Sequence, residues 1–142
     1  MNRIQMRRVR ATFDEVRPCG PALIAQVIRS LREHHSAMRG LLKGESGAHS
    51  ATLFATLEQI VRNAERFDAL EGPLGSLGAK AAALGLKPPH YALVREELLV
   101  AMANLLGDSW TDAVENDWRQ LLDACAGAML AEPADAAARK AA

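Results

Sequence analysis

The chain has few cysteines and no long apolar run, and each scarcity excludes a class of protein. Its two cysteines, Cys19 and Cys125, lie far apart and match no CxxC or zinc-finger spacing, so neither a disulfide framework nor a structural zinc site is expected. No stretch approaches the length of a membrane span, and arginines interrupt the N-terminal residues that a secretion signal needs to be apolar. We therefore expect a cytoplasmic protein that has no membrane partner.

Net charge is also lacking. Lys and Arg total 17 and Asp and Glu total 17, so no overall field draws the chain toward nucleic acid or an anionic surface. Nucleic acid is accordingly not expected as a partner. The composition, 49% hydrophobic and 24% charged over 142 residues, is typical of one globular domain with a single core.

Aromatic residues make up only 4% of the chain, β-branched residues are sparse, and no Asn-Gly or Asp-Gly hairpin signal occurs. Ala, Leu, Glu and Arg dominate the periodic stretches, which predicts an all-α fold. Gly72, Pro73, Gly75 and Gly78 interrupt residues 68–86, so that segment is expected to be weakly helical, and mainly over 74–84. The other helices are expected at about residues 4–16, 21–34, 36–42, 48–66 and 88–106. A last helix, capped by Ser109 or Thr111, is expected to end before Pro133.

Two of these helices carry informative apolar stripes. From 48 to 66 the apolar positions Leu53, Leu57, Ile60 and Ala64 recur at helical spacing, and His49 falls on the same stripe. A histidine one turn before Leu53 is expected to point toward an apolar pocket, where a buried imidazole needs a partner. In the last helix the stripe predicts that Trp118 and Cys125 are core residues rather than parts of a cofactor site.

The C-terminal half carries a specific likeness. The run Leu86-Lys87-Pro88-Pro89-His90-Tyr91, followed by Val94, Leu98, Leu106-Gly107, Trp110-Thr111 and Trp118, resembles the last two helices of flavohaemoglobins and single-domain bacterial globins. Gly20-Pro21, Leu23 and Leu41-Leu42 resemble the second and third helices of that family. The likeness spans about residues 4–131 and implies a globin fold, with one domain over 1–131 and a fraying tail over 132–142.

The resemblance also assigns positions around a haem, and several depart from the family's pattern. His49 and Leu53 match the distal helix, Ile28 stands at the position of the oxygen-facing tyrosine, and Leu42 stands at that of the phenylalanine that wedges against haem. The family's iron-binding proximal histidine is matched by Ala81, whose methyl group cannot bind iron. The remaining cofactor-binding positions that the resemblance implies are Leu86, Tyr91 and Val94.

Two functions of different class follow from this pattern. In the first, the protein binds haem b with His49 as the axial metal ligand, and it binds or senses a diatomic gas such as oxygen. In the second, it is a haem-free globin domain, folded and dimeric, that serves protein interaction or binds a small apolar ligand. The alternative for His49 itself is a pocket histidine satisfied by water.

No enzyme is expected, because no catalytic set of carboxylates, nucleophile and base emerges from the sequence. The chain has no length for a flavin and nicotinamide reductase, so any reducing electrons would come from an external reductase. Other charged residues have ordinary explanations: His34 and His35 suit the end of the second helix, and His90 suits the start of its own. Lys80 is a weak alternative iron ligand, and the candidates for pairing with haem propionates are Arg39, Lys43 and Lys87.

Overall fold

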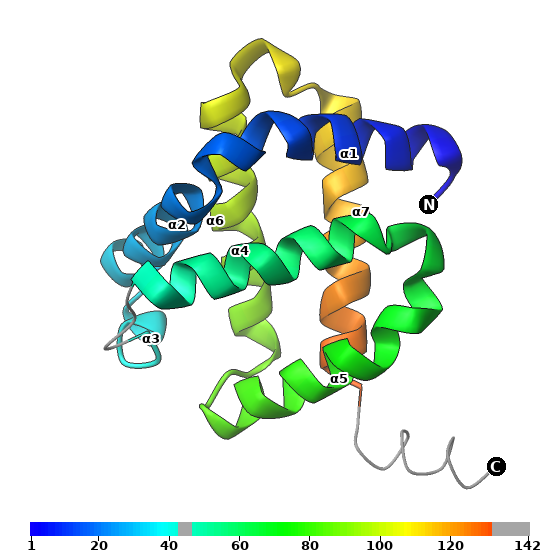
Figure 1. Ribbon diagram of the computed structural model, residues 1–142. Coiled ribbons are helices and arrows are strands. Elements are labelled where there is room, and N and C mark those ends of the chain that lie inside the picture. The colour runs from blue at the N-terminus through cyan, green and yellow to red at the C-terminus, as the bar shows by residue number, and fades with distance from the viewer. Residues whose placement is uncertain (43–46, 132–142) are drawn as a thin grey trace, which may run out of the picture.

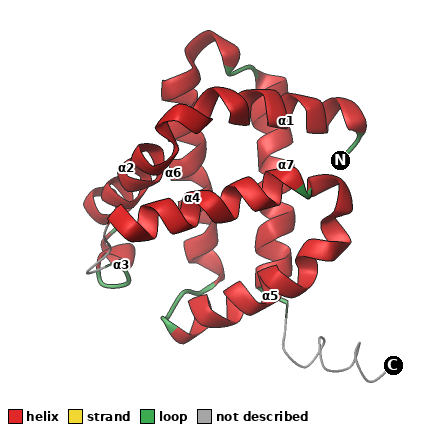
Figure 2. Cartoon of the chain, viewed as in Figure 1, coloured by secondary structure: helices red, strands yellow, loops and turns green. Residues whose placement is uncertain are grey.

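The computed structural model describes residues 1–42 and 47–131, and the side chains of all of these except residues 47–49. Throughout those ranges the chain is helical apart from short turns, and it contains no strand (Figures 1 and 2). The all-α prediction is confirmed. The elements are α1 (Arg3–Val16), η1 (Arg17–Cys19), α2 (Gly20–His34), α3 (Ser36–Arg39), α4 (Gly47–Arg62), η2 (Ala64–Arg66), α5 (Phe67–Ala83), α6 (Pro88–Leu106), η3 (Gly107–Ser109) and α7 (Asp112–Met129).

Helix ends follow local side-chain chemistry. Asn2 caps α1 by accepting the amide hydrogen of Gln5, while the Gln5 side chain accepts the Asn2 amide hydrogen, which satisfies two donors that the helix itself cannot use. Thr111, and not Ser109, caps α7, because the Thr111 side chain accepts the amide hydrogen of Val114.

The prediction for residues 68–86 was wrong in extent. Instead of a short, weak helix, α5 runs unbroken for 17 residues and includes Pro73. Packing on α7 explains the difference: a Cβ atom at Gly78 would lie 1.9 Å from the carbonyl oxygen of Met129, so the glycine lets the two backbones meet. Leu70 and Leu74 are buried on the same helix, and their burial compensates for the weak helix propensity.

α1 lies across α4 and α7, and α2 packs against α4 and α6 (Figure 1). The rings of Phe13, Phe54 and Trp118 meet where these helices converge, with centroids 5.2 Å apart for Phe13 and Phe54 and 6.4 Å apart for Phe13 and Trp118. Trp118 is fully buried and donates its indole N–H to Thr12 at 2.9 Å. Cys125 is also buried, so the prediction that Trp118 and Cys125 are core residues is confirmed.

The buried face of α4 differs in part from the expected stripe, and Ala64, which is only partly buried, lies beyond the helix in η2. Leu57 and Ile60 are buried as predicted, but Leu53 is 42% exposed and Phe54 is buried instead. Phe54 fits there because a Cβ atom at Gly20 would lie only 2.3 Å from its ring, so only glycine on α2 leaves the ring enough room. Leu53 therefore lies outside the core.

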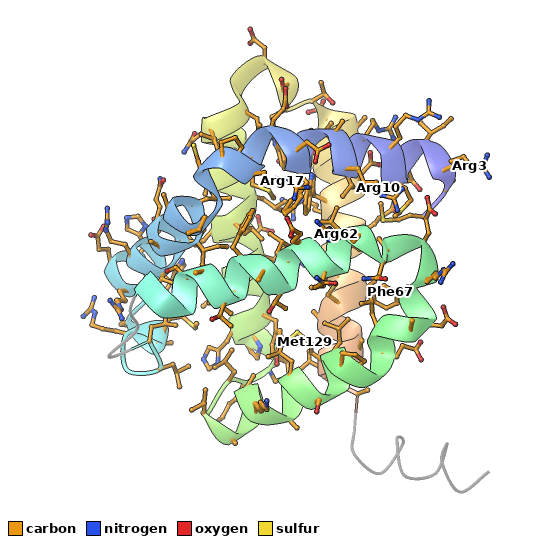
Figure 3. All side chains as sticks on the ribbon, in the orientation of Figure 1. Arg3, Arg10, Arg17, Arg62, Phe67 and Met129 are labelled. Atoms are coloured by element: carbon orange, nitrogen blue, oxygen red, sulfur yellow. The ribbon has the colours of Figure 1, made fainter. Side chains whose placement is uncertain are left out.

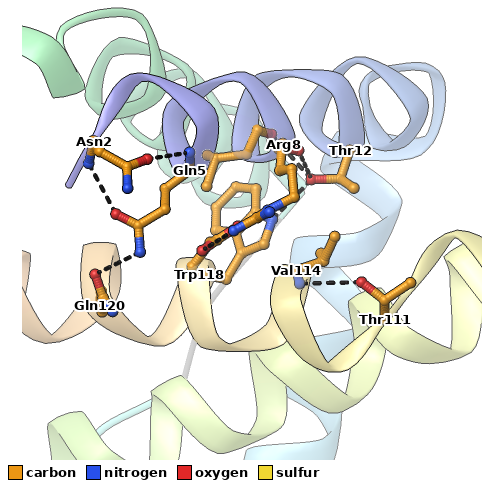
Figure 4. Close-up of polar contacts among 10 residues, drawn as sticks. Asn2, Gln5, Arg8, Thr12, Thr111, Val114, Trp118 and Gln120 are labelled. Atoms are coloured by element: carbon orange, nitrogen blue, oxygen red, sulfur yellow. Dashed lines mark hydrogen bonds and ion pairs between the residues drawn. The ribbon is translucent and has the colours of Figure 1, made fainter.

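Polar contacts also join α1 to α7 at the edge of this core (Figure 4). Asp117 is buried and is paired with Arg8, with Nε of Arg8 2.5 Å from Oδ2 of Asp117 and Nη2 3.1 Å from Oδ1. Gln5 contacts Gln120 at 3.3 Å. In the part of the chain that the structure covers, no helix combines the length and apolarity needed to cross a membrane.

Candidate functional site

The site that the sequence suggests would lie between α4 and α5. α4 packs chiefly on α2 and α5 on α7, so α4 and α5 have at most slight contact with each other. They run on either side of a region behind which α6 passes (Figure 1). Side chains from α6 and from the turn after α3 therefore have to line the region between α4 and α5.

The predicted site residues divide into two groups. Ile28 is buried in the core on α2, and Leu42, just after α3, and Val94 on α6 pack partly buried against that core. Ala81, Leu53 and Leu86 do not belong to the core cluster and remain partly or largely exposed. His49 lies in α4 one turn before Leu53, but its side chain is outside the described residues.

Tyr91 on α6 is a polar group in an otherwise apolar set. It is half-buried, and burial raises the pKa of its hydroxyl above the ordinary value, so the group is neutral at pH 7. Among the described residues its hydroxyl has no hydrogen-bond partner. It is therefore available to donate one hydrogen bond to a bound molecule.

The next residues to consider are those on α5, where the resemblance places the proximal position at Ala81. Ala81 carries a methyl group, and Lys80 beside it is exposed. His90 accepts the backbone N–H of Lys87 through Nδ1 at 2.8 Å, which confirms a structural role at the start of α6. Among the described residues, no three His, Cys, Asp or Glu side chains gather into a metal-binding group.

The other two histidines described are engaged elsewhere. Nε2 of His35 lies 3.1 Å from Oε1 of Glu97 on α6, and Nδ1 of His34 lies 3.7 Å from the same oxygen. His34 is the last residue of α2 and His35 is its C-cap residue, so both stand at the end of that helix as expected. Their contacts with Glu97 also join α2 to α6.

Sequence reasoning missed Arg32, which holds the corner after α3. Its Nε donates to the carbonyl oxygen of Leu42 at 3.0 Å, and its Nη2 donates to the same oxygen. Arg39, a candidate for propionate pairing, instead donates through Nε to the carbonyl oxygen of Arg32 at 3.0 Å. Lys87 is exposed, and Lys43 lies outside the described residues. Nothing in the sequence separates Arg32 from the other arginines.

These residues can be tested against haem, the group that the resemblance implies. The partly exposed apolar side chains Leu42, Leu53, Leu86 and Val94, with Tyr91, fit the apolar ring of haem. Ala81 does not fit the family's proximal bond to iron. These side chains are therefore chemically suited to the macrocycle, whereas Ala81 is not suited to bind its iron.

Comparisons with known proteins agree with the fold. The flavohaemoprotein of Rhizobium meliloti (strain 1021) is 28% identical over 115 residues, which cover 79% of this chain and 28% of that protein. The flavohaemoprotein of Oceanobacillus iheyensis is 24% identical over the same shares. The chain thus spans less than a third of the length of these curated relatives.

Solved structures match over nearly the whole chain. An engineered carbene transferase from Rhodothermus marinus superposes with a TM-score of 0.82 at 24% identity, covering 100% of this chain and 99% of that one. A hexacoordinated haem protein from an anhydrobiotic tardigrade gives a TM-score of 0.79 at 12% identity, covering 91% and 92%. The globin family model matches residues 43–129. This chain belongs to the globin family.

Proposed function

We propose that this globin binds haem b between α4 and α5 and, through it, binds or senses a diatomic gas such as oxygen. The observation that carries the proposal is the exposure of Leu53, which the resemblance places beside haem. Leu53 is 42% exposed on a helix whose neighbouring apolar residues are buried, as expected for a side chain whose partner is a bound molecule. The two curated relatives described above are both named flavohaemoproteins, which supports the same cofactor.

In this proposal, Leu42, Leu53, Leu86 and Val94 hold the ring by apolar contact, and the Tyr91 hydroxyl donates a hydrogen bond to the bound molecule. Haem supplies an iron at which a diatomic gas can bind. His49 is the candidate axial ligand, from the α4 side, because Ala81 has no donor atom. The side of the site that faces Ala81 is then open to the gas, the reverse of the family's usual arrangement.

The same proposal covers the protein's surroundings. Residues 1–131 act as one domain in the cytoplasm, and an external reductase supplies electrons when the iron has to be reduced. We propose no enzymatic reaction, since the described residues contain no set of nucleophile and base placed to act on a substrate. A homodimer is compatible with this function and is not required by it.

A haem-free globin domain is the second candidate, and Ala81 is the observation that favours it. Losing the proximal ligand removes the strongest single bond to the cofactor, while the apolar walls remain able to bind a small apolar molecule or a protein segment. In this candidate the core of helix–helix contacts holds the fold without a cofactor.

The two candidates differ in one visible absorption spectrum. If haem is bound, the purified protein, or the protein after stoichiometric addition of hemin, shows a Soret band. His49→Ala shifts or abolishes that band, whereas His34→Ala, which changes a histidine with a 63% exposed side chain, leaves it unchanged. Ala81→His should tighten hemin binding at least tenfold by restoring a bond to iron.

Three results would contradict the first candidate. Wild type that stays colourless after hemin addition would overturn haem binding and leave the haem-free domain. A Soret band that is identical in wild type and His49→Ala would overturn the axial role of His49. Unchanged hemin affinity in Ala81→His would overturn the position assigned to the missing ligand.

A further inference from the structure

The corner after α3 is anchored by a guanidinium group instead of by apolar packing alone. Both Nε and Nη2 of Arg32 donate to the single carbonyl oxygen of Leu42. Arg32 is half-buried, and none of the described carboxylates pairs with it. Its charge is thus directed at one backbone oxygen, and a charge-assisted hydrogen bond is among the stronger polar contacts in proteins.

Two further contacts make this anchor part of a continuous structure. Arg39 donates to the carbonyl oxygen of Arg32 at 3.0 Å, and the backbone N–H of Leu42 donates to the carbonyl oxygen of Met38 at 3.1 Å. The Met38 side chain is 1% exposed, so it fixes α3 to the core. The corner is therefore held at both its beginning and its end.

The corner also reaches the turn between α5 and α6. Gly85 in that turn has φ +102°, and a Cβ atom there would lie 3.0 Å from Cδ2 of Leu41. Leu41 and Gly85 therefore lie against each other, which brings the corner to the C-terminal end of α5, close in sequence to Ala81. These contacts close one end of the region between α4 and α5.

We propose that Arg32 is a positioning residue for this site: it fixes Leu42 and, with it, the corner that closes the site against the α5–α6 turn. The effect on release of the bound group rests on the proposed haem function, whereas the role of Arg32 in fixing the corner does not. Because no proximal bond is available at Ala81, retention depends more on the walls of the site than in a globin with that bond. A residue that fixes a wall then controls how long haem stays.

The first test is amide hydrogen exchange on the haem-free protein. Arg32→Met keeps a long apolar stem and removes every N–H donor, and we expect exchange at the Leu42 amide to accelerate about tenfold. Exchange in the interior of α7 should stay at the wild-type rate. Arg29→Met is the matched control, because Arg29 is exposed on the same helix and has no partner among the described residues.

The second test is the rate at which hemin leaves the loaded protein for an excess of an apoglobin with higher affinity. Release should be about tenfold faster in Arg32→Met and unchanged in Arg29→Met. It should be intermediate in Arg32→Lys, which keeps one donor nitrogen instead of two aimed at the carbonyl oxygen of Leu42. A merely structural role would instead accelerate exchange throughout the molecule in proportion to lost stability.

The outcomes separate the two proposals. Wild-type exchange at Leu42 in Arg32→Met would overturn the role of Arg32, whatever haem does. Faster exchange at Leu42 with wild-type hemin release would overturn its effect on the site. Failure of wild type to take up hemin would overturn the proposed function, and the exchange experiment would still decide whether Arg32 holds the corner.

Discussion

The hydroxyl group of Thr12 on α1 bonds to Trp118 on α7 inside the core. Oγ1 of Thr12 accepts the indole N–H of Trp118 at 2.9 Å and donates to the backbone carbonyl of Arg8 or Val9, at 2.8 and 3.0 Å. Thr12 and Trp118 are both buried, so no water can replace either partner. The contact matters less for its own strength than for the cost of leaving the indole N–H unpaired.

Thr12→Val tests this directly. Valine has nearly the shape of threonine but no hydroxyl, so the Trp118 N–H loses its partner, and we expect the free energy of unfolding to fall by about 1–3 kcal/mol. Urea denaturation followed by tryptophan fluorescence measures it. Thr56→Val is the control, because Thr56 bonds only to the carbonyl of Thr52 in its own helix at an exposed position. Equal effects of the two substitutions would contradict the role of Thr12.

Individual residues also show how far sequence reasoning reaches. Trp118 and Cys125 were predicted as core because they share a 3.6-residue periodicity with large apolar neighbours, and the structure buries both. The same reasoning placed Leu53 in the core and missed Phe54, because adjacent positions differ by only about 100° around a helix and both residues are apolar. What decided between them was Gly20 on another helix, and periodicity carries no information about such a contact.

At the scale of whole elements, α5 depends on its contact with α7. Gly78 meets the backbone of Met129, and Gly75 approaches the carbonyl of Ala128. Propensity alone predicted a weak, interrupted helix, because glycine and proline disfavour helix in isolation. The observed 17-residue helix indicates that Gly78 stabilises it indirectly, by allowing α5 to meet the backbone of Met129 at the end of α7 (Figure 3).

Alanine at two glycines of α5 should therefore have opposite effects. Gly78→Ala places a methyl group against the Met129 carbonyl, which cannot give way as a side chain could, and should destabilise the protein by more than about 2 kcal/mol. Gly72→Ala meets nothing within 4 Å and should stabilise it by about 0.5–1 kcal/mol through helix propensity. Thermal unfolding of both variants measures the difference. Equal shifts in the same direction would contradict the packing explanation.

For the molecule as a whole, the fold was more predictable than the site. Helix order and the globin likeness follow from punctuation by proline and glycine and from a long run of matched residues, which are local features. The proposed site depends on contacts of Arg32, Leu41 and Gly85, and the contact of Leu41 with Gly85 joins segments that are distant in sequence. The assignment of Ala81 to the proximal position comes from the matched run alone and stays a prediction.

Ion pairs connect the helices behind the site and should give the whole molecule a defined response to acid. Glu96 on α6 accepts two hydrogen bonds from Arg119 on α7, at 2.6 and 3.1 Å, and lies 3.1 Å from Arg95. The hydrogen bonds from Arg119 are the main cause that lowers the pKa of Glu96 below its ordinary value of 4.5. Arg95 also pairs with Asp123 at 2.6 Å, so two ion pairs join α6 to α7.

Because the folded pKa of Glu96 is lowered, its stabilisation is complete above about pH 4.5 and is lost as the pH falls through the folded value. Glu96→Gln should lower the free energy of unfolding at about pH 7 by no more than about 1 kcal/mol, since the pair is partly exposed. The difference from wild type should shrink as the pH falls below about 4.5 and through the folded pKa of Glu96. Urea denaturation across this range measures it, with Glu33→Gln, an exposed glutamate without a partner among the described residues, as the control. A difference that stays constant with pH would show that packing, and not the charge of Glu96, joins these helices.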